Sequence, residues 1–208
     1  MYTEARLQGD PLTQDLVEPH TELITRSETV RVGQRRTWRE AIVAQAAVDT
    51  VNIRLDVTTR AFSSQLVFTE QGRRETPRFR RYLPSGVHEV VRMALGKQVS
   101  AMRSWPGSLA GEPEAELQSF GPQIAGLLTE GDTALQSRVD AAARRADYRV
   151  REIATLVDDV NAVRVSTMGS LLQRGAKLGM TRDWAESFFR RAERDVSVPS
   201  GGEGGGEA

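Results

Sequence analysis

The amino-acid sequence predicts an all-α fold: an elongated antiparallel helical hairpin or bundle with one very long helix, two shorter helices and flexible termini. No proline follows Pro122 before Leu178, and apolar residues recur at steps of seven through most of this run. Such a repeat is typical of a helix that packs along its length. Unbroken, this helix would be about 85 Å long. The low aromatic share of 6% disfavours a β-sandwich or barrel.

Two rows of the repeat define the packing face expected for the long helix. One row contains Val139, Ala146, Ile153, Val160 and Thr167, and the other contains Leu135, Ala142, Arg149, Leu156 and Val163. The rows lie three and four residues apart, so they share one face of the helix. We therefore expect this face to pack against a partner helix.

The first helix is expected from about residue 35 to residue 71. Its apolar and small positions alternate at spacings of four and three: Ala44, Val48, Val51, Leu55, Thr58, Phe62 and Leu66. Residues 50–59 are rich in β-branched side chains, which lower helix propensity by a few tenths of a kcal/mol each, so a strand is the alternative there. The seven-residue period continues through this stretch and favours a helix. Gly72 suits the position just after its end.

Connections that contain prolines separate the first helix from the long one. Residues 73–84 are expected to lead into a second helix over residues 85–104. Pro106 ends this helix, because proline disfavours the helical backbone conformation for the residue before it. Residues 107–121 are expected to form a loop, with or without one helical turn at residues 113–120.

The long helix is expected to begin at Pro122, since proline is well tolerated at the first helical position. Gly126 and Gly131 weaken its first turns by up to about 1 kcal/mol each, so a kink or break is the alternative to a continuous helix. Thr181 can cap a last short helix over residues 182–194.

These elements divide the chain into three parts. Residues 1–30 contain prolines and no clear period, which indicates a mobile N-terminal arm or a loosely docked extension. Residues 31–195 are expected to form a single elongated helical domain. Residues 196–208 are rich in glycine and glutamate and are expected to be a disordered tail.

Composition sets limits on function. The 28 basic and 28 acidic residues cancel, so the chain has no global attraction to nucleic acid or to anionic membranes. It contains no cysteine, which excludes disulfides and thiolate chemistry. We expect neither a secretory signal peptide nor a transmembrane segment, and therefore a cytoplasmic protein.

No motif predicts catalysis. His88 and Glu89 begin a stretch similar to the zinc-binding helix of metalloproteases, but Arg92 stands where the second histidine ligand would be. Asp158 and Asp159 are adjacent, so their carboxylates point about 100° apart and cannot act as a facing acid–base pair. Phosphate-binding glycine loops and nucleophile elbows are absent. We therefore expect no enzyme activity, no cofactor and no metal.

Two features are candidates for binding a partner. Five arginines within nine residues lie around Phe79 and Tyr82: Arg73, Arg74, Arg78, Arg80 and Arg81. They predict a structural or subunit contact, with nucleic acid or a membrane as alternatives. The last helix carries Trp184, Phe188 and Phe189, which either cap the bundle together with Trp105 and Trp38 or dock into a partner.

The sequence therefore favours a non-enzymatic structural or assembly protein, an oligomerising helical rod or spacer that makes protein–protein contacts. Its partners would be copies of itself or components of a larger assembly. The residues expected on the packing or oligomer face are Val48, Leu55, Phe62, Val139, Ala146, Ile153, Val160 and Val163. The alternative is a helical nucleic-acid-binding module that uses the loop from Arg73 to Arg81. A helical protein that inserts into membranes is a third hypothesis, weakened by the shortness of the apolar runs.

Overall fold

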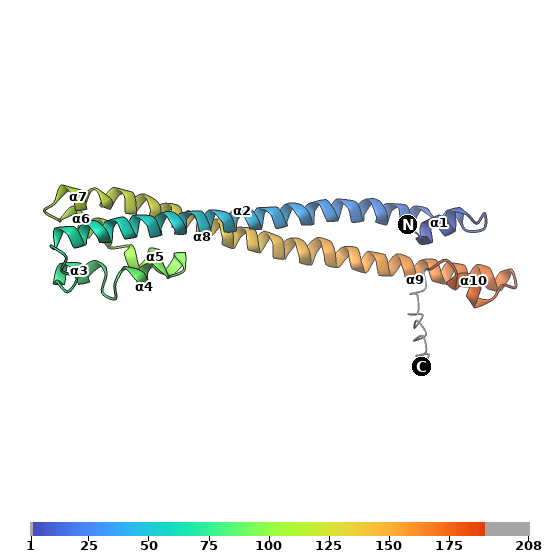
Figure 1. Cartoon of the computed structure of the whole chain (residues 1–208). Coiled ribbons are helices and arrows are strands. Elements are labelled where there is room, and N and C mark those ends of the chain that lie inside the picture. The colour runs from blue at the N-terminus through green and yellow to red at the C-terminus, as the bar shows by residue number, and fades with distance from the viewer. Residues whose placement is uncertain (1, 190–208) are drawn as a thin grey trace, which may run out of the picture. The chain divides into compact units, whose positions relative to one another are not determined.

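The computed structural model describes residues 2–189, and within them every regular element is helical, which confirms the all-α prediction (Figure 1). The elements are α1 (Tyr2–Gln8), the 3-10 turn η1 (Gln14–Leu16), α2 (Glu18–Thr69), α3 (Pro77–Tyr82), α4 (Val87–Val91), α5 (Leu95–Met102), α6 (Trp105–Ala110), α7 (Ala115–Gln118), α8 (Phe120–Tyr148), the π-helical turn η2 (Arg149–Ile153), α9 (Ala154–Lys177) and α10 (Arg182–Glu186).

The chain forms two compact units rather than the single domain expected over residues 31–195. The central unit is Arg31–Ile153, and the terminal unit joins residues 2–30 to residues 154–189. The physical reason is that the buried apolar side chains form two separate clusters, one in each unit. The long helix α2 contributes residues to both units.

In the central unit, α2 and α8 run antiparallel, as predicted. Ion pairs show how the two helices are aligned: Glu40 pairs with Arg144, and Arg54 pairs with Glu130. The predicted positions of the first helix are buried here, including Val48, Leu55, Phe62 and Leu66. Helices α5 and α6 pack on α8 and close this core (Figure 1).

Four aromatic rings fill the middle of this core. The ring of Phe62 lies 5.1 Å from that of Tyr82, 5.3 Å from that of Trp105 and 5.6 Å from that of Phe120, measured between ring centroids. The pairs with Tyr82 and Phe120 are edge-to-face, a geometry that adds about 0.5–1.5 kcal/mol beyond the burial of their area. Tyr82, Trp105 and Phe120 come from three short or newly started helices, so this cluster anchors them to α2.

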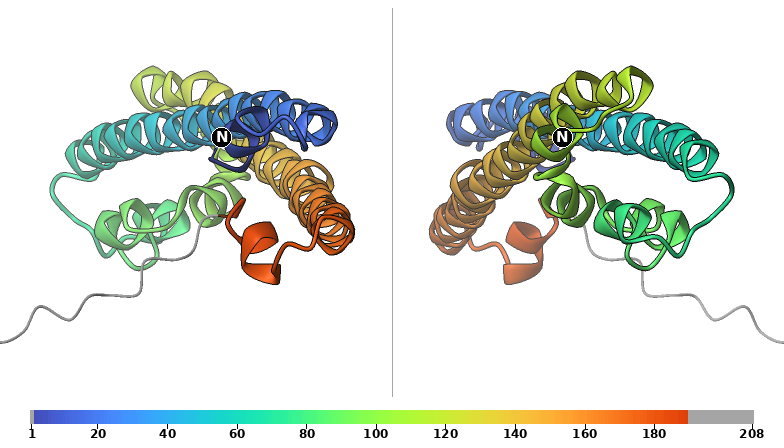
Figure 2. Two further views of the ribbon diagram at one scale, coloured as in Figure 1. Left: turned by 90° about the vertical axis from the view of Figure 1, so that its right-hand side faces the viewer. Right: turned by 90° about the vertical axis from the view of Figure 1, so that its left-hand side faces the viewer.

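The terminal unit is also an antiparallel helix pair. A hydrogen bond joins His20 of α2 to Thr167 of α9 at 2.9 Å, and an ion pair joins Arg26 to Asp159. Beyond this pair, α10 packs back on the end of α9 (Figure 2). Burial lowers the pKa of His20, so the neutral imidazole is favoured at this contact.

The structure differs from the mobile arm expected over residues 1–30. Helix α1 is docked through Leu7, which is fully buried against Leu171 and Phe188. The hydroxyl of Thr13 donates to the carbonyl oxygen of Leu7 at 2.9 Å and fixes the turn that follows α1. Pro19 does not interrupt α2, because it lies in the first turn of this helix, where no helical hydrogen bond is lost.

The connections between α2 and α8 are more helical than expected. The predicted second helix over residues 85–104 is two helices, α4 and α5, and the connection before it contains α3. Pro106 does not end a helix but lies in the first turn of α6, which begins at Trp105. The expected helical turn in residues 113–120 is α7. These short helices are held by tertiary burial, which local propensity does not reveal.

The glycines do not break the long helix. Helix α8 continues through Gly126 and Gly131 to Tyr148, and the irregular turn is instead η2, where the helix widens to π geometry. The last helix α10 begins after Thr181 as predicted but ends at Glu186. The tail predicted over residues 196–208 lies outside the described residues.

Replacement of the two α8 glycines by alanine should have opposite outcomes. A Cβ at Gly126 would meet no atom within 4 Å, so Gly126→Ala should raise the free energy of unfolding by about 0.5–1 kcal/mol. A Cβ at Gly131 would lie 2.9 Å from Cγ2 of Val99, so Gly131→Ala should lose this gain through the clash. Urea unfolding of both variants measures the difference, and equal gains would contradict the packing of α5 on α8.

Candidate functional site

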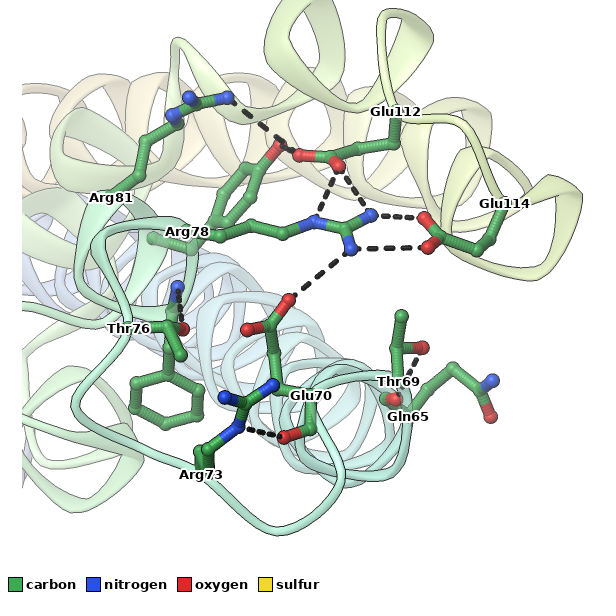
Figure 3. A network of polar contacts seen from close by, with 11 residues as sticks. Gln65, Thr69, Glu70, Arg73, Thr76, Arg78, Arg81, Glu112 and Glu114 are labelled. Atoms are coloured by element: carbon green, nitrogen blue, oxygen red, sulfur yellow. Dashed lines mark hydrogen bonds and ion pairs between the residues drawn. The ribbon is translucent and has the colours of Figure 1, made fainter.

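The arginine-rich segment forms a network of ion pairs around Arg78 (Figure 3). Arg78 lies on α3, and its Nε donates to Glu112 Oε2 at 2.8 Å. Its Nη1 donates to Glu70 at 3.2 Å and to Glu114 at 3.1 Å. A single guanidinium group therefore joins the end of α2 to the segment that precedes α7.

The side chains at the centre of this network are largely buried, which favours a structural role for it. The side chain of Glu112 is only 4% exposed, and that of Arg78 is 21% exposed. Hydrogen bonds to Glu114 and Glu112 raise the pKa of Arg78, and the Arg78 hydrogen bond lowers the pKa of Glu114. The phenol of Tyr82 donates to Glu112 Oε1 at 2.6 Å, and burial raises the pKa of this phenol above its ordinary value. The buried carboxylate of Glu112 is therefore paired with Arg78 and hydrogen-bonded by Tyr82 within the chain.

The other arginines of the segment differ from Arg78 in their surroundings. Arg73 donates from Nε to the carbonyl oxygen of Glu70 at 3.3 Å and so caps the end of α2. Arg80 pairs with the exposed Glu75, and Arg81 lies 3.8 Å from Glu112. Arg74 is exposed. The geometry thus favours a contact within the chain for Arg78, and no continuous row of unpaired arginines is left to follow a nucleic-acid backbone.

The aromatic residues of the last helix are brought together at the end of the terminal unit. Phe188 is fully buried, and its ring lies 5.2 Å from that of Trp184. The guanidinium of Arg6 lies over Phe188 at 5.3 Å, and that of Arg164 lies over Phe189 at 5.8 Å. This arrangement favours the capping role over docking, because Phe188 is already covered.

The residues expected on the packing or oligomer face separate into two groups. On α2, Val48, Leu55 and Phe62 are buried within the central unit. On the long C-terminal helical run, Ile153 and Val163 are half-buried, whereas three positions are exposed: Val139, Ala146 and Val160. The α2 positions thus pack within the chain, whereas the exposed positions on the long C-terminal run are open to solvent.

A groove between α2 and α8 in the central unit was not predicted. Its volume is about 660 Å³, and its lining residues are Gln34, Thr37, Ala41, Ala142, Arg145, Ala146, Tyr148, Arg149, Val150 and Ile153. Ala142 and Arg149 belong to a row of the heptad repeat in the long helix. The arginine within that apolar row is the signal in the sequence that marks the groove.

The other chemical candidates stay apart. His88 is exposed on α4, and Asp159 is taken up by its ion pair with Arg26. Among residues 2–189 no group of histidine, aspartate or glutamate side chains could hold a metal ion. Within the same residues no helix is long and apolar enough to cross a membrane.

Comparison with protein-family models, with curated proteins and with solved structures finds no match for this chain.

Proposed function

We propose that the protein is a non-enzymatic assembly protein that associates with copies of itself through the outer face of α2. The observation that supports this is that α2 is apolar on two opposite faces. One face is buried in the core, and the other carries Val43 at 63%, Ile53 at 63% and Val57 at 58% exposure. A helix in a lone monomer gains nothing from a second apolar face, whereas a helix shared between subunits buries it.

The outer face has the spacing of a coiled-coil seam. Its members are Val43, Ala46, Thr50, Ile53 and Val57, which alternate at steps of three and four, and all are exposed. We call these five residues the outer stripe. The stripe covers about two heptads, which suits a local contact between subunits more than an independent coiled coil.

One charge pair beside the outer stripe suits a parallel pairing of two copies. In a parallel coiled coil, a residue before one heptad faces the residue five positions later on the partner helix. Asp49 stands five residues before Arg54. Arg54 already pairs with Glu130 within the chain, so a contact with Asp49 of a second copy would share this arginine between two carboxylates. The opposite charges favour a second copy over an unrelated apolar surface as the occupant of the stripe.

The test is the mass of the protein in solution, with two stripe residues made acidic. Light scattering coupled to size-exclusion chromatography should show an oligomer for the unmodified chain and a monomer for the double variant Val43→Glu/Val57→Glu, because two carboxylates would be buried in the interface. The matched control is Val157→Glu/Val165→Glu, which makes the same change at two exposed valines of α9 and should stay oligomeric. A monomeric unmodified chain at micromolar concentration would reject the proposal.

A further inference from the structure

We infer that the groove between α2 and α8 binds an acidic amphipathic helix of another protein. The groove is separate from the outer stripe, and the proposed self-association does not require its binding partner. Three observations in the central unit support this inference: the groove continues the surface on which α5 packs, it is lined by small side chains, and its arginine side chains are unpaired.

The groove continues the surface on which α5 packs. Where α5 packs on α8, Gly131 lies against Val99 and Leu95, and Leu135 lies against Gly96. Along α8, the positions that follow Leu135 at helical spacing are Arg138, Ala142, Arg145 and Arg149, and three of these line the groove. Helix α5 begins at Leu95, so it covers only part of α8 (Figure 1). The same channel that holds α5 therefore continues beyond it with no helix in residues 2–189 to fill it.

The floor of the groove suits the backbone of a close-packed helix. Three alanines line it: Ala41 from α2, and Ala142 and Ala146 from α8. Small side chains let a third helix approach and place its ridge between the two others. Tyr148 closes one side of the groove, because its ring lies where a side chain on Gly33 would be.

The charge of the groove selects an acidic partner. Residues 31–41 and 138–153 contain nine arginines against four acidic residues, in a chain whose net charge is zero. Arg145 and Arg149 line the groove, and their side chains make no hydrogen bond or ion pair within the described part of the chain. They are one helical turn apart, which matches carboxylates placed three or four residues apart on a docked helix.

The probe for this site is a synthetic helix that carries the expected pattern. It has three heptads, alanine and leucine along one face, glutamates flanking that face, and a fluorescein label; a second peptide has lysine in place of each glutamate. Fluorescence anisotropy measures the binding of each peptide to the full chain. The groove variant is Arg145→Glu/Arg149→Glu, and the matched control is Arg74→Glu/Arg92→Glu, which makes the same charge change at two exposed arginines outside the groove.

The glutamate peptide should bind the unmodified chain and the control, and the groove variant should bind it at least tenfold more weakly, roughly the effect of opposing like charges. The lysine peptide should show the reverse preference, and this gain of binding also shows that the groove variant is folded. An equal loss of glutamate-peptide binding in the groove variant and in the control would overturn the inference. A single-stranded oligonucleotide that binds more tightly than the peptide, with the same dependence on Arg145 and Arg149, would also overturn it. Oligomer mass should be the same in both variants, which separates this result from the test of self-association.

Discussion

Replacement of Arg78 by methionine should destabilise the central unit by about 3 kcal/mol, because a buried carboxylate that loses its partner retains the cost of its desolvation. Methionine keeps most of the volume of the side chain but removes every hydrogen bond that the guanidinium donates to Glu112 and Glu114. Glu112 is nearly inaccessible to solvent, and only the phenol of Tyr82 and the more distant Arg81 would remain beside it.

Denaturant unfolding measures this loss. With Trp38→Phe and Trp184→Phe as the background, the buried Trp105 is the fluorescent reporter of the central unit. The matched control is Arg80→Met, whose ion pair with Glu75 is exposed and should contribute less than about 0.5 kcal/mol. Adding Glu112→Gln to Arg78→Met should restore part of the stability, since it removes the unpaired charge. A loss below about 1 kcal/mol for Arg78→Met would show that the network is not structural.

Phe62→Ala should cost about 4 kcal/mol, the range found for a large aromatic side chain removed from a packed core. Phe62 is fully buried and contacts three other rings, so its removal leaves a cavity that its neighbours cannot fill without moving α3, α6 and α8. The expected result is a lower denaturation midpoint for the central unit.

The same helix contains a chemically identical control. Phe68 lies six residues further along α2 and is 79% exposed, so Phe68→Ala should change the free energy of unfolding by less than about 0.5 kcal/mol. Both variants remove a phenylalanine from one helix, and the two positions differ chiefly in burial. Similar losses at both positions would contradict the assignment of the two faces of α2.

Local pattern was sufficient to predict the two long helices. The seven-residue spacing through residues 50–59 outweighed the strand propensity of their β-branched side chains, and the structure confirms a helix there. The same spacing placed Val48, Leu55 and Phe62 on one face, where they are buried. It could not show that Val139 and Ala146 are exposed, because a heptad row marks a face of a helix and not what covers it.

The candidate sites depended on contacts between residues far apart in the chain. The sequence identified Arg78 as part of a basic cluster, but its meeting with Glu112 and Glu114 depends on how α3 and α7 fold on α2. The docking of Leu7 against Leu171 could likewise not be predicted from the sequence, since the two residues are separated by most of the chain.

The sequence by itself determined that this protein is helical and which faces of its longest helices are apolar, because helix periodicity is a local property. The tertiary structure alone decided which of those faces are buried. It also decided that Arg78 of the basic cluster is paired within the chain, and that a groove with unpaired arginine side chains remains between α2 and α8. These outcomes depend on which distant segments pack together. That packing is set by the burial of apolar side chains in the core of each unit.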